Sequence, residues 1–169
     1  SCTQYIQNGK LRREAPLQDV LYPGAPVSYT FKDAFNRDAL VLGPRISVPS
    51  LRYTTVTITS NAQPSVCGST AMNGQPVLRQ FELSGTNTTG SYPLRLYYSA
   101  ANPDESNANT SNNLALYYCN SSTLLWEKFT GTSGVDSNGV YAEATVNSFT
   151  GSSWAIGSNN PINRTVTFN

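Results

Sequence analysis

Short runs of apolar residues alternate with polar residues along almost the whole chain, and clusters of glycine, proline, asparagine and serine separate the runs. Alternation with a period of two is typical of β-strands that bury one face, whereas the spacing of amphipathic helices is scarce here. The pattern predicts strands at residues 26–32, 39–48, 51–59, 77–83, 92–99, 113–119, 124–129, 139–146, 152–156 and 164–168. Short strands joined by turn signals such as Asn73-Gly74 and Asn138-Gly139 predict an all-β fold, an antiparallel β-sandwich of Ig-like or jelly-roll type.

The alternation also assigns residues to the buried face of three strands. The residues on that face are leucines, tyrosines, valines and alanines: Leu94, Leu96, Tyr98, Leu114, Leu116, Tyr118, Val140, Ala142, Ala144 and Val146. We predict that these side chains form the core. Trp126 and Trp154 each lie between apolar neighbours on a strand, so we predict that both are buried core residues.

The chain of 169 residues has the length of one domain with a single core. Its local composition and strand pattern divide it into three parts. Residues 1–40 carry many of the basic residues and several prolines, which predicts an N-terminal arm or edge strands. Residues 41–158 form the predicted sandwich. Residues 159–169 form an extra C-terminal strand, which must pair with its own sheet or with the edge of a neighbouring subunit's sheet. In the second case the candidate donor residues are Ile162, Arg164, Val166 and Phe168, and the product is a head-to-tail polymer.

Composition excludes several classes of function. Charged residues make up 12% of the chain, the formal net charge is +1, and no block of like charge occurs, which argues against nucleic-acid partners and acidic membranes. The chain has no histidine, so histidine-based catalysis and most transition-metal sites are excluded, and we expect no cofactor. No run of residues is apolar enough to cross a membrane. A chain that starts at Ser1 fits removal of a signal peptide, and we expect a secreted protein at the cell surface or outside the cell.

Three cysteines, Cys2, Cys67 and Cys119, have neither C-x-x-C spacing nor histidine partners, which argues against a zinc site. In an oxidising compartment the expected disulfide joins Cys67 and Cys119, because both lie inside the strand-rich body. Cys2 is then unpaired or bonded to another chain. The alternative is that all three are reduced thiols packed as small apolar residues.

Two tyrosine doublets follow the same pattern at residues 94–98 and 114–118. Because successive side chains of a strand point to opposite faces, one ring of each doublet is expected inside and the other outside. We predict that Tyr97 and Tyr117 are exposed and contact a ligand or a protein interface, by stacking on a sugar or packing against another protein. The alternative is a cross-strand aromatic pair without a ligand.

Carboxylates offer little support for catalysis. Glu82, Glu127 and Glu143 lie in alternating strands where a charge is expected to face solvent, although a glycosidase would need two acids facing each other across a cleft. We therefore expect no enzyme and name no catalytic residue.

Polar loops offer two further kinds of candidate site. The loop at residues 102–107 brings together Asp104, Glu105 and Asn107, a weak calcium candidate whose alternative is an ordinary solvated loop. Four N-x-[ST] sequons are candidate glycosylation sites, at Asn87, Asn109, Asn120 and Asn163.

The order of several motifs along the chain resembles that of a known domain. The motifs are the glycine-bearing run at residues 41–44, the strand at 52–59, the leucine- and tyrosine-rich pair at 94–98 and 114–118 around Asp104-Glu105, the tryptophan strand at 124–129 and the close at 149–158. They resemble a β-sandwich domain of large secreted surface proteins of bacteria that use the type-nine secretion route. The resemblance spans residues 41–158. It implies an extracellular, non-enzymatic structural or adhesive module, and it assigns no catalytic residue.

These observations lead to one expected function with alternatives. We expect a secreted structural subunit or adhesive module, whose partner is another copy of itself, assembled into a surface filament or sheath by strand addition. The first alternative is a carbohydrate-binding module that uses exposed tyrosines and binds glycans. The second is an enzyme that uses a cation or an unusual carboxylate.

Overall fold

The protein is described by a computed structural model at residues 3–7, 10–16, 28–33, 35–43, 53–64, 66–85, 89–99, 103–148 and 152–161. Within these residues the chain forms twelve strands and one short helix. Their bounds are β1 (Thr3–Gln7), β2 (Lys10–Pro16), β3 (Tyr29–Lys32), β4 (Asp38–Leu42), β5 (Tyr53–Ser60), β6 (Gly74–Gly85), β7 (Thr89–Tyr98), α1 (Pro103–Ser106), β8 (Leu114–Asn120), β9 (Leu125–Phe129), β10 (Thr132–Asp136), β11 (Gly139–Ser148) and β12 (Ser152–Pro161). No helix in the described part of the chain is long and apolar enough to span a membrane.

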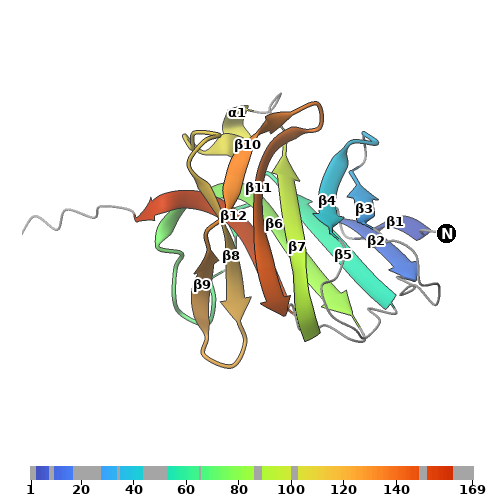
Figure 1. Ribbon diagram of the computed structural model, residues 1–169, viewed down its shortest axis with the longest axis horizontal. Coiled ribbons are helices and arrows are strands. Elements are labelled where there is room, and N and C mark those ends of the chain that lie inside the picture. Colours follow the sequence, from blue (N-terminus) through green and yellow to red (C-terminus); the bar gives the residue numbers. More distant parts are fainter. Residues whose placement is uncertain are drawn as a thin grey trace, which may run out of the picture.

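The strands form two antiparallel sheets that face each other (Figure 1). The seven-stranded sheet has the order β1-β2-β5-β6-β12-β8-β9, and the five-stranded sheet has the order β10-β11-β7-β4-β3. The last strand, β12, lies between β6 and β8 rather than at an edge. The predicted all-β sandwich is confirmed.

The core lies between the two sheets and is built from the faces that the alternation assigned. All ten residues predicted from the three strands belong to the main apolar cluster. Trp154 is completely buried, and its ring centroid lies 4.9 Å from that of Tyr118 and 5.7 Å from that of Phe129. The prediction for Trp154 is therefore confirmed. The alternation correctly predicted which residues of these three strands lie in the core.

The strands that the sequence pattern missed lie near the rims of the sheets. β1 and β2 extend the seven-stranded sheet beyond β5, and β10 is the outer strand of the five-stranded sheet. The side chains of β10 are exposed or partly buried, and the sequence of β10 shows no clear alternation of apolar and polar residues. β12 also continues past its predicted end, since Pro161 pairs with Gly74. The segment that contains the candidate donor residues Ile162, Arg164, Val166 and Phe168 lies outside the described residues, as does Cys2.

A second, smaller apolar cluster lies on the outer face of the seven-stranded sheet. It contains Met72, Ala115, Tyr117 and Ala155, with Trp126 packed against it. Met72 comes from the connection between β5 and β6, so this connection lies over the outer face of β8 and β12. Small apolar clusters are common under long loops. The face that the sequence assigned to solvent is covered here.

The Cys67–Cys119 disulfide attaches this connection to the sheet. Cys67 belongs to the β5–β6 connection and Cys119 to β8, their Cα atoms are 5.4 Å apart, and they are 52 residues apart in sequence. The predicted pairing is confirmed. Since Cys119 points to the same outer face as Tyr117, two residues earlier on β8, the disulfide holds the connection over that tyrosine.

Candidate functional site

Polar side chains gather on the outer face of the five-stranded sheet around one arginine. We call this group the Arg95 cluster: Arg95, Tyr97, Asp136, Tyr141 and Glu143. The register of β7 and β11 places Arg95 opposite Glu143 and Tyr97 opposite Tyr141, so four of the five residues come from two neighbouring strands. Asp136 is added from the end of β10.

Each member of the Arg95 cluster is held by another member. Arg95 Nε donates to Glu143 Oε2 at 2.7 Å, and Arg95 Nη1 donates to the Tyr97 hydroxyl at 3.2 Å. The Tyr97 hydroxyl donates to Asp136 Oδ2 at 2.8 Å. The Arg95 guanidinium also lies 4.2 Å from the centroid of the Tyr141 ring, a cation–π distance. The cluster is therefore ordered without a ligand.

The electrostatics of the Arg95 cluster follow from these contacts. Partial burial lowers the pKa of the Arg95 guanidinium, but its hydrogen bonds to Tyr97 and Glu143 and the negative charge of Glu143 outweigh burial, so the pKa lies above its ordinary value. Burial raises the pKa of the Tyr97 hydroxyl, the bond from Arg95 opposes that rise, and the bond to Asp136 adds to it. Arg95 is a permanent cation and Tyr97 a neutral hydroxyl at neutral pH.

A pocket of about 340 Å³ adjoins the Arg95 cluster on the same face. It is lined by Ser28, Val41, Gly43, Pro93, Arg95 and Glu143. Four of these residues lie on β4, β7 and β11, Gly43 directly follows β4, and Ser28 directly precedes β3. The pocket thus combines an apolar wall with one ion pair.

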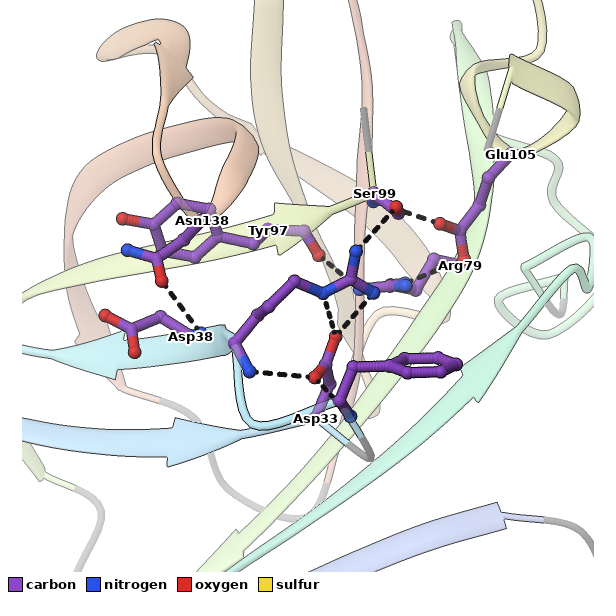
Figure 2. Close-up of polar contacts among 9 residues, drawn as sticks. Asp33, Asp38, Arg79, Tyr97, Ser99, Glu105 and Asn138 are labelled. Atoms are coloured by element: carbon purple, nitrogen blue, oxygen red, sulfur yellow. Dashed lines mark hydrogen bonds and ion pairs between the residues drawn. The ribbon is translucent and has the colours of Figure 1, made fainter. Parts of the chain in front are cut away.

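A polar network centred on Arg79 joins residues of both sheets and of α1 (Figure 2). Arg79 reaches from β6 toward β7 and α1, where its Nε donates to Glu105 Oε1 at 2.8 Å and its Nη1 donates to the Tyr97 carbonyl oxygen at 2.9 Å. The second carboxylate oxygen of Glu105 accepts the Ser99 amide at 3.2 Å. The side chains of Arg79 and Glu105 are 6% and 0% exposed, so this ion pair is shielded from water.

The same network ties together turns from distant parts of the chain. Arg37, from the β3–β4 turn, pairs with Asp33 and donates from Nη1 to Ser99 Oγ at 3.0 Å. The Asp38 amide donates to the side-chain oxygen of Asn138 in the β10–β11 turn at 3.2 Å. These charged groups are paired with one another. Since Arg79 extends from β6 of one sheet and donates to β7 of the other, the network holds the two sheets together.

Both outward tyrosines are buried, and the prediction that they are exposed is wrong. Tyr97 is 3% exposed and Tyr117 is 2% exposed. Tyr97 is held within the Arg95 cluster. Tyr117 lies under the β5–β6 connection, its hydroxyl donates to the Ser158 carbonyl oxygen at 2.6 Å, and a side chain at Gly74 would overlap that hydroxyl. Burial also raises the pKa of Tyr117. Neither ring can serve as a sugar platform in this arrangement.

Trp126 also differs from its prediction as a residue of the main core. It pairs with Cys119 and therefore faces outward, where it packs partly buried against the smaller cluster. The partial burial fits the position of β9 at the edge of the sheet, since among the described strands β9 pairs with β8 alone.

The three glutamates considered for catalysis are not brought together. Glu82 lies on β6, Glu127 on the edge strand β9 and Glu143 on the other sheet. Glu143 is paired with Arg95, and Glu127 accepts from Asn120. The described residues therefore offer no facing pair of acids from this set.

The loop considered for calcium uses its oxygen and nitrogen atoms within the protein. Glu105 is bound by Arg79, Asn107 donates from its side chain to the Pro76 carbonyl oxygen at 2.8 Å, and Asp104 is exposed. Among the described residues no group of three or more acidic, cysteine or histidine side chains is placed to hold a metal ion. The weak calcium candidate does not form a converging set of ligands.

Two of the four sequons lie within the described residues. The Asn109 amide donates to the Ser106 carbonyl oxygen at 2.9 Å, and the Asn120 amide donates to Glu127 at 2.6 Å. Asn87 and Asn163 lie outside the described residues. Both described asparagines therefore have side-chain amides engaged within the chain.

The Arg95 cluster and the buried Arg79–Glu105 pair were missed from the sequence. Alternation alone places Arg95 and Tyr97 on one face of a strand and Tyr141 and Glu143 on one face of another. That these two faces meet depends on the register between β7 and β11, whose paired residues Arg95 and Glu143 are far apart in the chain. Comparisons with protein-family models, with curated protein sequences and with solved structures find no match to this chain.

Proposed function

We propose that this chain is an extracellular structural subunit or adhesive module that self-assembles into a surface filament or sheath by strand addition between subunits. The observation that carries the proposal is the edge strand β9, which pairs with β8 on one side and, among the described residues, with no strand on the other. An edge strand presents N–H and C=O groups to which an extended segment of another chain can pair.

Apolar side chains are exposed at the beginning of β9. Leu124 and Leu125 are 54% and 51% exposed. Leu124 lies against Gly68, close in sequence to Val66, which is 60% exposed. Exposed apolar residues beside an open strand edge are typical of a surface that another chain covers.

The charges of β9 are held by its own sheet. Glu127 accepts from Asn120 at 2.6 Å, and Lys128 Nζ donates to the Asn159 carbonyl oxygen at 3.0 Å. Charged residues on an edge strand oppose unselective pairing, so a strand that adds here must match their arrangement. This favours a specific partner such as a second copy of the chain.

The edge strand β10 of the five-stranded sheet is bound to the other sheet. The Leu114 backbone amide of β8 donates to Ser133 Oγ of β10 at 3.2 Å. Val135 of β10 is nevertheless 59% exposed, which makes it a matched control position for Leu125.

The donor in this proposal is the segment 162–169, in which Ile162, Arg164, Val166 and Phe168 alternate with threonine and asparagine. Its alternation is what an inserted strand needs, since one face must enter a core and the other must face solvent. The disulfide favours an oxidising compartment, and the resemblance to secreted surface domains favours the same location.

Light scattering and electron microscopy of the purified protein test the proposal. We expect large ordered assemblies of the full chain, and we expect truncation after Pro161 or the substitution Leu125→Lys to give monomers. A synthetic peptide of residues 162–169 should bind the truncated protein and block assembly of the full chain. Val135→Lys adds the same charge to the other sheet's edge and should leave assembly unchanged.

Three results would contradict the proposal. A full chain that stays monomeric at high concentration removes self-assembly altogether. Equal assembly of the truncated protein excludes the C-terminal donor, and equal assembly of Leu125→Lys excludes the β9 edge as acceptor.

A further inference from the structure

The pocket beside the Arg95 cluster has a composition that the assembly proposal does not use. Its volume of about 340 Å³ is at the lower end of the roughly 300 to 1,000 Å³ typical of small-molecule sites. Val41 and Pro93 supply apolar surface, and Arg95 and Glu143 supply donors and an acceptor. The site lies on paired strands, which are rigid supports for a binding site.

Arg95 and Glu143 keep hydrogen-bonding capacity after binding each other. Their contacts use Nε and Nη1 of Arg95 and Oε2 of Glu143, which leaves Arg95 Nη2 and Glu143 Oε1 without a hydrogen-bond partner among the described residues. The two side chains are 29% and 33% exposed, and both line the pocket. A donor and an acceptor are therefore fixed side by side at the pocket.

Neighbouring hydroxyl groups match this arrangement. Each hydroxyl both donates and accepts, so one hydroxyl of a vicinal diol can donate to the Glu143 carboxylate while the next accepts from the Arg95 guanidinium. The C–H face of the same ring can then lie against Val41 and Pro93. Because Arg95 is already bound by Glu143 and Tyr141, it is held in place before a ligand arrives.

The local charge decides between neutral and acidic ligands. One guanidinium, of Arg95, faces two carboxylates, of Asp136 at 3.5 Å and Glu143 at 2.7 Å, so the cluster carries one net negative charge. An anionic ligand would be repelled by the acids and would find the cation already neutralised.

We propose that the pocket formed by Val41, Gly43, Pro93, Arg95 and Glu143 binds a neutral sugar ring through a vicinal diol. The ring's hydroxyls bind Arg95 Nη2 and Glu143 Oε1, and its C–H face packs on Val41 and Pro93. This site lies on the five-stranded sheet and is independent of the β9 edge. It uses neither Tyr97 nor Tyr117 as a stacking platform.

The test is an NMR titration of the ¹⁵N-labelled protein with glucose, galactose, mannose and N-acetylglucosamine, each added to tens of millimolar. We expect at least one of these sugars to shift the backbone amides of Val41, Gly43, Arg95 and Glu143, and we expect glucuronate to bind more weakly because of its charge. The truncated, monomeric protein is suitable if the full chain assembles, so failure of either proposal is seen separately.

Two variants and a control identify the groups responsible. Glu143→Gln and Arg95→Lys should each weaken binding about tenfold or more, as expected when a charged hydrogen-bond partner is altered. Glu127→Gln makes the same chemical change as Glu143→Gln on the other sheet and should bind as the unchanged protein does. The proposal is overturned if none of the four sugars shifts these amides, if the shifts map elsewhere, or if folded Glu143→Gln binds with unchanged affinity.

Discussion

The buried ion pair between Arg79 and Glu105 allows the sharpest test of what holds this sandwich together. Replacing Arg79 with methionine keeps an unbranched apolar side chain but leaves the Glu105 carboxylate, which is 0% exposed, without its counter-charge. Breaking a buried pair in this way typically costs about 3 to 5 kcal/mol. The Tyr97 carbonyl oxygen also loses its donor, which adds about 1 kcal/mol. We therefore expect Arg79→Met to lower the free energy of unfolding by about 4 to 6 kcal/mol.

A second variant separates the charge from the packing. In Arg79→Met combined with Glu105→Gln no buried charge remains, and the glutamine oxygen can still accept the Ser99 amide. We expect this double variant to lose only about 1 to 3 kcal/mol, so that it is more stable than Arg79→Met alone.

Equilibrium unfolding in urea with the disulfide intact measures these differences. Arg37→Met is the control, because its guanidinium is 32% exposed and the Asp33 carboxylate with which it pairs keeps the backbone amides of Phe35 and Arg37 as hydrogen-bond donors, so we expect a smaller loss of about 1 to 2 kcal/mol. The reasoning is refuted if Arg79→Met costs no more than this control, or if the double variant is as unstable as the single one.

Three further predictions concern stability. Replacing Cys67 and Cys119 by serine should lower the free energy of unfolding, measured in urea, by about 4 kcal/mol for a closed loop of 52 residues. It should also increase acrylamide quenching of tryptophan fluorescence, because the β5–β6 connection loosens. An unchanged unfolding midpoint would contradict this prediction. Trp154→Ala should cost about 3 to 5 kcal/mol. Trp154→Phe should cost much less, because the buried indole N–H has no acceptor among the described residues; equal losses in a thermal melt would be inconsistent with that reason. Burial raises the pKa of Tyr97 and Tyr117 above the unfolded value of about 10, so the stability that they contribute is complete below that pH and is lost as the pH rises through the folded values. Absorbance at about 295 nm reports phenolate formation, and tyrosines that all titrate near pH 10 before unfolding would disprove the prediction.

The sequence by itself determined the inner layer of this protein. In β7, β8 and β11 the residues alternate so regularly that each side chain's face follows from its position, because the period of a strand is two. The ten residues assigned in this way are all in the core, and so is Trp154. The pairing of Cys67 with Cys119 was also open to prediction, since both lie in the strand-rich body.

The tertiary structure alone decided what happens on the outer faces. Alternation tells which face of its strand Tyr117 occupies, but not that the distant β5–β6 connection lies over that face and buries the ring. In the same way it places Arg95 outward without indicating that the register with β11 puts Glu143 opposite it.

The buried charge pair shows the limit most clearly. Arg79 and Glu105 are 26 residues apart and no local pattern links them, yet α1 brings the glutamate to Arg79 in the middle of β6. Local patterns record only the preference of a residue for one side of its own strand. What covers that side depends on contacts between segments far apart in the chain, and these exist only once both sheets and their connections have formed.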